Sequence, residues 1–382
     1  MINELENSGK ADTHVHTKYS GFTKYSFAHF PESISEPDMV VKAAIRRGLD
    51  VLCITDHNTI AGALKAKKYA AGLTGFEVVI GEEVSTSEGE MIGLFLQDRI
   101  DPGLGAEETA QRLHEQGGIA IAPHPFSPHC PCLKQKVQFL DLDAVEVFNA
   151  VHRDPYSNRL ASRKSVTNGK ASTAGSDAHS LEMVGNAYTT FPGNSADELR
   201  TSILRKNTFV GGETTSLGSC IRWSNGVAKE VHRAIYRSLM GKIIQEDLLH
   251  IRIHRIKKRN KIIGFFGAAF YLFPPVSGLA GAVGEIITRK KAKMIWDEYK
   301  FSSEPSSIGD SNNNKIFKSW MNIDLISKLS GISKDIIYKE IGIEDSFTDN
   351  RESLDKLCIE KTLNCTQVVE RLNQLIVSEK SE

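Results

Sequence analysis

Residues 50–58 read Asp-Val-Leu-Cys-Ile-Thr-Asp-His-Asn, a short apolar run followed at once by polar side chains. Residues 50–55 have the length and character of a buried parallel strand. Two cations and a glycine at 46–48 form a helix stop just before it. His57 then stands where a barrel strand delivers side chains to the carboxyl-end rim of its sheet. The segment predicts a β/α unit that presents polar groups at one end of a sheet.

The same unit recurs along the first half of the chain. Short, largely apolar runs at 76–80, 118–122, 143–148 and 171–174 alternate with amphipathic stretches. This alternation predicts β-α units around a mostly parallel sheet, and therefore the α/β class. A closed or nearly closed β/α barrel is the simplest architecture for so many units. We place this domain at residues 1–215.

Four further motifs place ligand-type side chains at or beside these strands. Asp12-Thr-His-Val-His16 sets two histidines two residues apart on one face of a strand, where they can chelate one metal ion. The others are Gly81-Glu-Glu-Val-Ser85, Pro123-His-Pro125 and Gly175-Ser-Asp-Ala-His179. Any one motif alone is better explained as a helix cap or a hydrogen-bonded buried histidine. Five together predict a metal cluster, because structural histidines have no reason to follow successive strands.

Composition limits the class of protein and its compartment. The chain has 382 residues, and 47 Lys and Arg balance 47 Asp and Glu, so no overall field favours nucleic acid or an acidic membrane. The six cysteines follow no disulfide framework, and the N-terminus has no apolar signal region. We expect a cytoplasmic protein, or one that associates with a membrane from that side.

The sequence changes character after residue 215. Residues 216–301 form a basic helical region in which 262–284 carry no charge between basic flanks. This stretch is long enough to cross a bilayer, but Pro274 and Pro275 interrupt it. The alternatives are a re-entrant or interfacial membrane hairpin and a pair of apolar helices packed in the protein body.

The last part of the chain is expected to be separate. Residues 302–314 are rich in Ser, Asn, Gly and Pro and are interpreted as a linker, and 315–382 as a small helical module. The module is either a helix-turn-helix contact for DNA or protein, or a solvated helical appendage. Its partner is unknown.

The five motifs, in this order, resemble the polymerase and histidinol phosphatase (PHP) superfamily over about residues 11–212. The resemblance implies a distorted (β/α)7 barrel of PHP type, here with a C-terminal helical extension, and two or three divalent ions per chain (Mn, Zn, Fe or Mg). Asp12 would orient His14 or His16 from behind. The implied metal ligands are His14, His16, His57, Glu83, His124, Asp177 and His179, with Glu146, or Asn149 beside it, as a further candidate.

Two segments depart from the family pattern. Ser20-Gly21-Phe22 stands where many relatives have an acidic residue or a histidine after the first motif, and His29 is the candidate replacement. His129-Cys-Pro-Cys132 is an unusual soft-ligand run, which we interpret as a loop wall, because a separate zinc site normally has four clustered ligands.

The function implied by the resemblance is that of a metal-dependent phosphoesterase, a hydrolase acting on phosphate ester bonds. A hydroxide held by a di- or trinuclear metal centre would attack a small phosphomonoester or nucleotide. His57 and His129 are candidate acids for the leaving group. One alternative is a 5′-3′ exonuclease acting on RNA or DNA ends, with a cation track at 252–261. The other is a non-catalytic metal-binding or membrane-tethering module.

Overall fold

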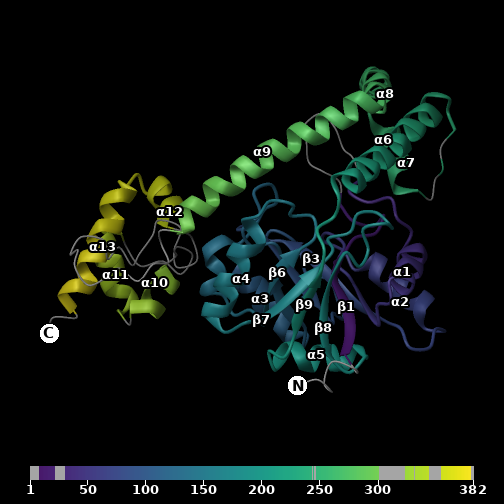
Figure 1. Ribbon diagram of the computed structural model, residues 1–382. Helices are drawn as coiled ribbons and strands as arrows, with labels where there is room; N and C mark the ends of the chain where they lie inside the picture. Colours follow the sequence, from purple (N-terminus) through teal and green to yellow (C-terminus); the bar gives the residue numbers. More distant parts are fainter. Residues whose placement is uncertain are drawn as a thin grey trace. The chain divides into compact units, whose positions relative to one another are not determined.

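The fold is described from a computed structural model (Figure 1), in which residues 8–21, 31–242, 244, 247–300, 323–330, 332–343 and 354–379 are placed well enough to describe. The chain divides into two units, Met1–Ser302 and Ser303–Glu382. His29 and the linker predicted at 302–314 lie outside the described residues.

A nine-stranded sheet in the order β7-β6-β5-β4-β3-β2-β1-β8-β9 organises the first unit. Pairing is parallel from β1 to β3 and from β5 to β7, and antiparallel where β4, β8 and β9 join. The strands are β1 (Ser8–Val15), β2 (Val51–Ile54), β3 (Glu77–Ser85), β4 (Glu90–Leu94), β5 (Ile119–Ala122), β6 (Ala144–Asn149), β7 (Ala171–Gly175), β8 (Ala187–Pro192) and β9 (Phe209–Gly212).

The sheet curls until the ends of β7 and β1 meet. The main-chain N–H of Asp177 donates to the carbonyl oxygen of His14 at 2.8 Å, and that of His16 donates to Ala178 at 3.0 Å. These bonds nearly close the barrel and confirm the predicted α/β class. Two details differ from expectation. The sheet has nine strands rather than seven, and Glu83 lies inside the long strand β3, paired with β4, rather than just after a strand.

Helices between the strands pack against the sheet. Val41 and Ala44 of α1 are buried against Leu52 and Ile54 of β2, and burying each large apolar side chain contributes roughly 1.5–3 kcal/mol. Ser195 caps α5, and Glu198 completes the reciprocal capping box. The helices are α1 (Pro37–Arg46), α2 (Ala61–Ala70), α3 (Ala106–Glu115), α4 (Ser157–Asn168) and α5 (Ala196–Leu204).

The first unit continues beyond the barrel as α6 (Leu217–Leu239), α7 (Leu248–Arg255), α8 (Lys258–Tyr271) and α9 (Pro274–Lys300). Helix α9 is tied to the barrel, because Tyr299 packs on Phe126 and Glu285 pairs with Arg153 at 3.0 Å. Within the described residues no single helix is long and apolar enough to cross a bilayer, but α8 and α9 reach that length and composition as a pair bent by 85°.

Short helices make up the described part of the second unit. They are α10 (Ile323–Ser330), α11 (Lys334–Ile341), α12 (Leu354–Glu360) and α13 (Cys365–Glu379). Ile326, Ile337, Leu357 and Leu372 are buried in this unit, so it has an apolar interior of its own.

Candidate metal centre

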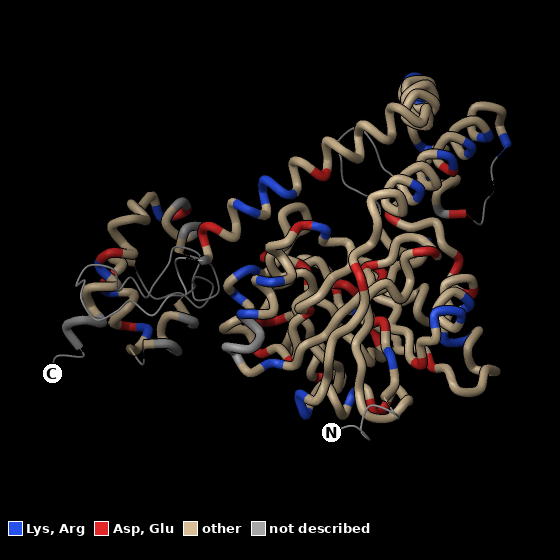
Figure 2. The backbone as a smooth tube through the Cα atoms, viewed as in Figure 1, with Lys and Arg blue, Asp and Glu red and all other residues tan. Residues whose placement is uncertain are grey.

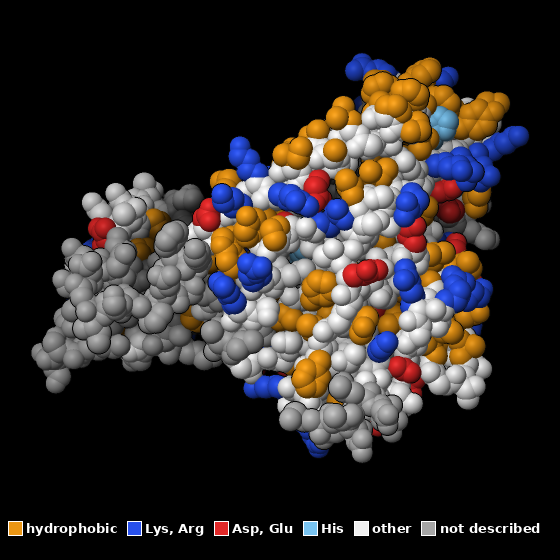
Figure 3. All heavy atoms as spheres, viewed as in Figure 1, with side chains coloured by type: hydrophobic (Ala, Val, Ile, Leu, Met, Phe, Trp, Pro, Cys, Tyr) orange, Lys and Arg blue, Asp and Glu red, His pale blue; other side chains and the backbone are white. Residues whose placement is uncertain are grey.

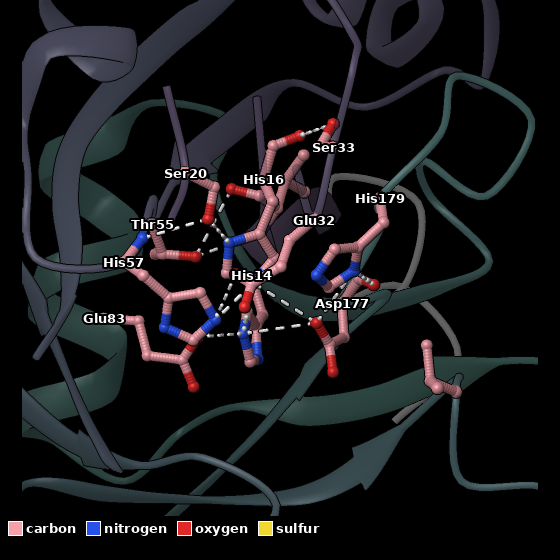
Figure 4. A network of polar contacts seen from close by, with 12 residues as sticks. His14, His16, Ser20, Glu32, Ser33, Thr55, His57, Glu83, Asp177 and His179 are labelled. Carbon is pink, nitrogen blue, oxygen red and sulfur yellow. Dashed lines mark hydrogen bonds and ion pairs between the residues drawn. The ribbon is translucent and has the colours of Figure 1, made fainter. Parts of the chain in front are cut away.

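The side chains singled out in the sequence converge at the carboxyl ends of the parallel strands (Figure 4). Each is delivered by a strand or by the turn after it, so positions far apart in sequence become neighbours. The contributing residues are His14 on β1, His16 after it, His57 after β2, Glu83 on β3, His124 after β5, and Asp177 and His179 after β7.

The backbone at this rim takes unusual conformations. His124 and Asp177 have φ values of 28° and 49°, in the left-handed region that side chains other than glycine rarely adopt. Gly175, at the end of β7, passes so close to His14 that a Cβ atom there would lie 2.3 Å from the Cβ of His14. Such strain persists only where surrounding contacts enforce it, and it is typical of functional sites.

Glu83 lies at the centre of the cluster. Its Oε2 is 3.2 Å from Nε2 of His14, and 3.3 Å from both Nε2 of His16 and Nδ1 of His57. Its Oε1 is 3.1 Å from Nε2 of His124. One buried carboxylate therefore faces four imidazoles, which is the position of a ligand shared between metal ions.

Asp177 occupies the other side of the cluster (Figure 4). Its Oδ1 lies 3.2 Å from Nε2 of His16 and 3.5 Å from Nδ1 of His179. The ring of His179 also points Nδ1 at the main-chain oxygen of Asp177, 2.8 Å away, which favours an N–H at Nδ1 and a lone pair on Nε2.

Glu146 contacts His14 from behind. Its Oε1 is 3.0 Å from Nδ1 of His14, and its Oε2 accepts the main-chain N–H of His124 at 2.8 Å and Nδ2 of Asn149 at 3.0 Å. With Nδ1 donating to this carboxylate, Nε2 of His14 would be the nitrogen that binds a cation once it has lost its proton. A carboxylate behind a histidine is the usual means of orienting a metal ligand. The geometry favours Glu146 as a positioning residue over a direct ligand.

Ligand atoms gather in four sets of three, each within 4.8 Å. Imidazole nitrogens and carboxylate oxygens suit divalent ions such as Zn, Mn and Fe. Nε2 of His14 and Nε2 of His16 are only 3.1 Å apart, a contact that a shared cation would satisfy. The residues therefore fit a metal cluster. The four sets are His14, His16 and Glu83; His14, His124 and Asp177; His57, Glu83 and Glu90; and His16, His57 and His179.

Burial and mutual charge set the protonation of the metal-free cluster. Burial lowers the pKa of His14, but the charges of Asp177, Glu146 and Glu83 outweigh it and hold that pKa well above its usual value. Burial raises the pKa of Glu83, yet nearby imidazoles outweigh it and hold that pKa well below its usual value. Burial, followed by the charge of His179, lowers the pKa of His16 to about 3. Glu83 is therefore ionised and His16 neutral, whereas His14 must release a proton before its Nε2 can bind a cation.

Glu90 joins the cluster, although no sequence motif indicated it. Its Oε1 and Oε2 lie 3.7 Å from Nδ1 of His57 and 3.8 Å from Nε2 of His124. Glu90 opposes Ser85 across the β3–β4 hairpin, and that register carries its carboxylate back toward Glu83. The signal available in the sequence was a lone acidic residue at the start of a strand.

His152 is a second residue that the sequence did not indicate. It is buried, and among the described residues neither ring nitrogen has a hydrogen-bond partner. Its ring centroid lies 5.8 Å from that of His124 and 5.0 Å from that of His129. An unpartnered buried imidazole costs stability, so its position beside the cluster suggests that a ligand satisfies it.

Asp12 fixes the loop that carries Asp177. Its carboxylate accepts the main-chain N–H of Ser176 at 2.9 Å, that of Gly185 at 2.8 Å and the hydroxyl of Ser176. Its bond to His14 is with the main-chain N–H, at 3.3 Å. Asp12 thus orients the backbone around the site, and not the imidazole ring of His14 or His16 as its place in the first motif had led us to expect.

Helix α6 forms one wall of the site. The ring of Trp223 lies 5.1 Å from that of His179, and its indole N–H donates to the main-chain oxygen of Glu32 at 2.9 Å. Oε2 of Glu32 is in turn 3.2 Å from Nε2 of His57. A residue beyond the predicted barrel domain therefore contacts the cluster directly and holds a loop beside it.

Comparison with known proteins places the chain in a family. A family model for the PHP domain matches residues 12–116, and a PHP-associated model matches residues 155–208. The uncharacterized proteins MJ1587 and MJ1588 of Methanocaldococcus jannaschii are 52% and 37% identical to this chain over 157 and 111 residues. The first match covers 41% of this chain and 91% of its relative, and the second 29% and 95%.

Solved structures give more distant likenesses. A two-domain protein from Bacteroides vulgatus that contains a predicted PHP-like metal-dependent phosphoesterase aligns with a TM-score of 0.45 at 17% identity. That alignment covers 54% of this chain and 65% of the other. PsfC from Pseudomonas syringae aligns with a TM-score of 0.42 at 22% identity, over 61% of this chain and 99% of the other. On its family-model matches and its relatives, the chain belongs to the PHP family.

Proposed function

We propose that this chain is a metal-dependent phosphoesterase that hydrolyses a small phosphomonoester or a nucleotide. The observation that carries the proposal is the set of four overlapping ligand triads, two of which share Glu83. Shared ligands hold ions close together, and two close divalent ions can clamp a phosphoryl group from both sides.

We assign two or three ions to the cluster. His14, His16 and Asp177 would hold one side, and Glu83 would be shared with an ion held by His57 and Glu90. When bound, such ions supply Lewis acidity toward a phosphoryl oxygen and lower the pKa of water. The chain contributes orientation and exclusion of solvent, because His14 and Glu83 are fully buried.

Access to the cluster favours a terminal phosphate. The side chains of His57 and His179 are 16% and 14% exposed, whereas those of His14 and Glu83 are at most 1% exposed. A substrate that reaches such a centre must project its phosphate from an end. This supports a monoester or nucleotide over an internal phosphodiester.

The two predicted leaving-group acids differ in their suitability. His57 belongs to two of the ligand triads, so the proposal uses it to bind metal. Burial, with the charge of His124, lowers the pKa of His129, and a neutral imidazole is better suited to accept a proton than to donate one. We therefore assign neither as the acid.

The test is a double variant, His14→Ala with Asp177→Ala, compared with the wild type and with a matched His254→Ala, Asp297→Ala control on the helical extension. Elemental analysis measures bound metal, and a panel of phosphomonoesters, nucleotides and 5′-phosphorylated RNA measures turnover with added Mn. We expect the site variant to lose both metal and turnover while circular dichroism stays unchanged. A site variant that keeps wild-type metal content and turnover rules out this centre. Exclusive turnover of RNA ends supports the exonuclease instead.

A further inference from the structure

Helix α8 exposes an apolar side where a surface helix is normally polar. Its inner side, which includes the buried residues Lys261 and Ala268, packs against α6. Its outer side presents Ile263, Phe266 and Phe270, which are 61%, 68% and 69% exposed. Amphipathic helices of soluble proteins turn the apolar side inward and the charged side to water, whereas α8 has apolar side chains on both its inner and its outer side.

The apolar surface continues around the bend into α9. Phe273, at the bend, is 60% exposed, and Leu279 and Ile286 of α9 are 67% and 66% exposed. Figure 3 shows hydrophobic side chains gathered over α8 and the first part of α9. We call this surface the apolar elbow; it consists of Ile262, Ile263, Phe266, Phe270, Phe273, Leu279, Val283, Ile286 and Ile287.

Cations border the apolar elbow on both sides, and the acidic residue within its sequence range, Glu285, is paired with Arg153 and Arg289. Residues 248–284 contain no Asp or Glu. Lys257, Lys258 and Arg259 are exposed just before the elbow, and an exposed basic run at 289–291 follows it. Figure 2 shows basic positions on the helices of this region, including α9. An apolar face with a cationic border is complementary to an anionic lipid surface.

Contacts of α8 with α6 and α7 limit how deeply the apolar elbow can enter a bilayer. Nζ of Lys261 donates to Oγ of Ser238 at 2.8 Å and to the main-chain oxygen of His254 at 2.9 Å. The rings of Phe265 and His232 stack at 4.1 Å. A helix held along one side cannot be surrounded by lipid. Its 14 residues also span only about 21 Å, less than the roughly 30 Å of a hydrocarbon core.

We infer that the apolar elbow is a membrane-docking surface, which lies in the headgroup region of an anionic bilayer and does not cross it. A second copy of the chain or a protein partner also buries apolar side chains, but neither requires the acid-free stretch at 248–284. The inference is independent of the proposed phosphoesterase activity. Because Glu285 and Tyr299 fasten α9 to the barrel, docking would hold the metal centre at the membrane.

The test is flotation of the full chain with vesicles of phosphatidylcholine, with and without phosphatidylglycerol. We expect binding to the anionic vesicles, weakened by salt. Phe266→Ser with Phe270→Ser should lower the partition coefficient roughly tenfold or more, because two aromatic side chains no longer enter the lipid. Replacing Lys257, Lys258 and Arg259 with Gln should cause a similar loss on anionic vesicles only.

Control variants remove exposed groups of the same kinds elsewhere on the same unit. Leu204→Ser with Phe209→Ser removes apolar side chains that are 53% and 64% exposed, and Lys67→Gln with Lys68→Gln removes exposed cations of α2. Both controls should float like the wild type. Absence of wild-type flotation at low salt overturns the inference, as does equal binding of the Phe266, Phe270 variant. If light scattering instead shows a dimer that this variant dissociates, the elbow joins two copies and the inference fails.

Discussion

Nδ1 of His14 lies 3.0 Å from one carboxylate oxygen of Glu146, and the other oxygen accepts the main-chain N–H of His124 at 2.8 Å. One side chain on β6 thereby fixes the ring of a residue on β1 and the turn after β5. Both of the residues that it holds contribute to the ligand triads.

Glu146→Gln should weaken metal binding while leaving the fold intact. The amide has an NH2 group in place of one oxygen, so a donor would face either Nδ1–H of His14 or the main-chain N–H of His124. Loss of such an orienting partner typically costs 10–100-fold in metal affinity, and we expect a loss in that range for Mn or Zn by isothermal titration calorimetry. Glu107→Gln on the exposed side of α3 is the control. Unchanged metal affinity in the Glu146 variant would show that His14 binds metal without being oriented by this carboxylate.

Glu90→Gln should stabilise the metal-free protein above neutral pH. Burial and the charge of Glu83 raise the pKa of Glu90 from 4.5 to about 7. The unfolded chain therefore loses this proton at lower pH than the folded chain, and stability falls as the pH rises from 4.5 to about 7. Each pKa unit corresponds to about 1.4 kcal/mol, so a gain on the order of 1 kcal/mol or more is expected at pH 8.

Thermal melts with a chelator, at pH 5 and pH 8, measure that difference. With metal bound, the Glu90→Gln variant should melt at a lower temperature than the wild type, because it lacks a carboxylate that faces His57 and His124. Glu115→Gln, on exposed helix surface, should melt like the wild type under all conditions. If the Glu90 variant is no more stable than the wild type at pH 8 without metal, then burial and the charge of Glu83 do not raise the pKa of Glu90.

His152→Phe separates a structural role from a functional one. Phenylalanine has a similar shape and removes two buried nitrogens that lack partners among the described residues. An unpartnered buried polar group costs about 1–3 kcal/mol, so the free energy of unfolding without metal should stay the same or rise. We expect kcat/KM to fall roughly tenfold or more, with His254→Phe as the control. Full activity in a stabilised variant would leave His152 without a role in turnover.

Trp223→Phe should loosen the loop that carries Glu32. The change removes the indole N–H that donates to the main-chain oxygen of Glu32, and a hydrogen bond of this kind contributes about 1 kcal/mol. Trp223→Ala should cost roughly 2–3 kcal/mol, since it also leaves a cavity. Urea unfolding measures both, with Trp296→Phe on α9 as the comparison. Equal stabilities of the Trp223 variants and the wild type would contradict a supporting role for α6.

Much of the barrel could be predicted because its strands are short and bounded by helix stops and polar motifs. The strand predicted at 50–55 is β2 at Val51–Ile54, and the one predicted at 118–122 is β5 at Ile119–Ala122, each within one residue at its ends. The antiparallel strand β4 was missed because residues 90–94 show little periodicity, and only pairing with β3 defines them. Sequence spacing likewise could not show that β8 pairs with β1.

The cluster was predictable to the extent that its members follow strands. His57 and His124 come directly after apolar runs, and parallel strands bring such positions to one edge. Glu90 reaches the same place through hairpin register, and His152 through a turn after β6, neither of which leaves a local pattern. For a similar reason, the sequence could not decide whether the apolar stretch at 262–284 is exposed or packed in the protein body. Its exposure depends on how much of α8 is covered by α6, which leaves no local pattern.

The position of Trp223 beside His179 also allows metal binding at the site to be followed by tryptophan fluorescence. The two rings are 5.1 Å apart, and the chain has only three tryptophans. A paramagnetic ion such as Mn bound at His179 would quench the emission of this indole, whereas Zn would not quench it by the same route. The chain thus has a native fluorophore at the edge of the site, and occupancy of the cluster can be followed without adding a dye.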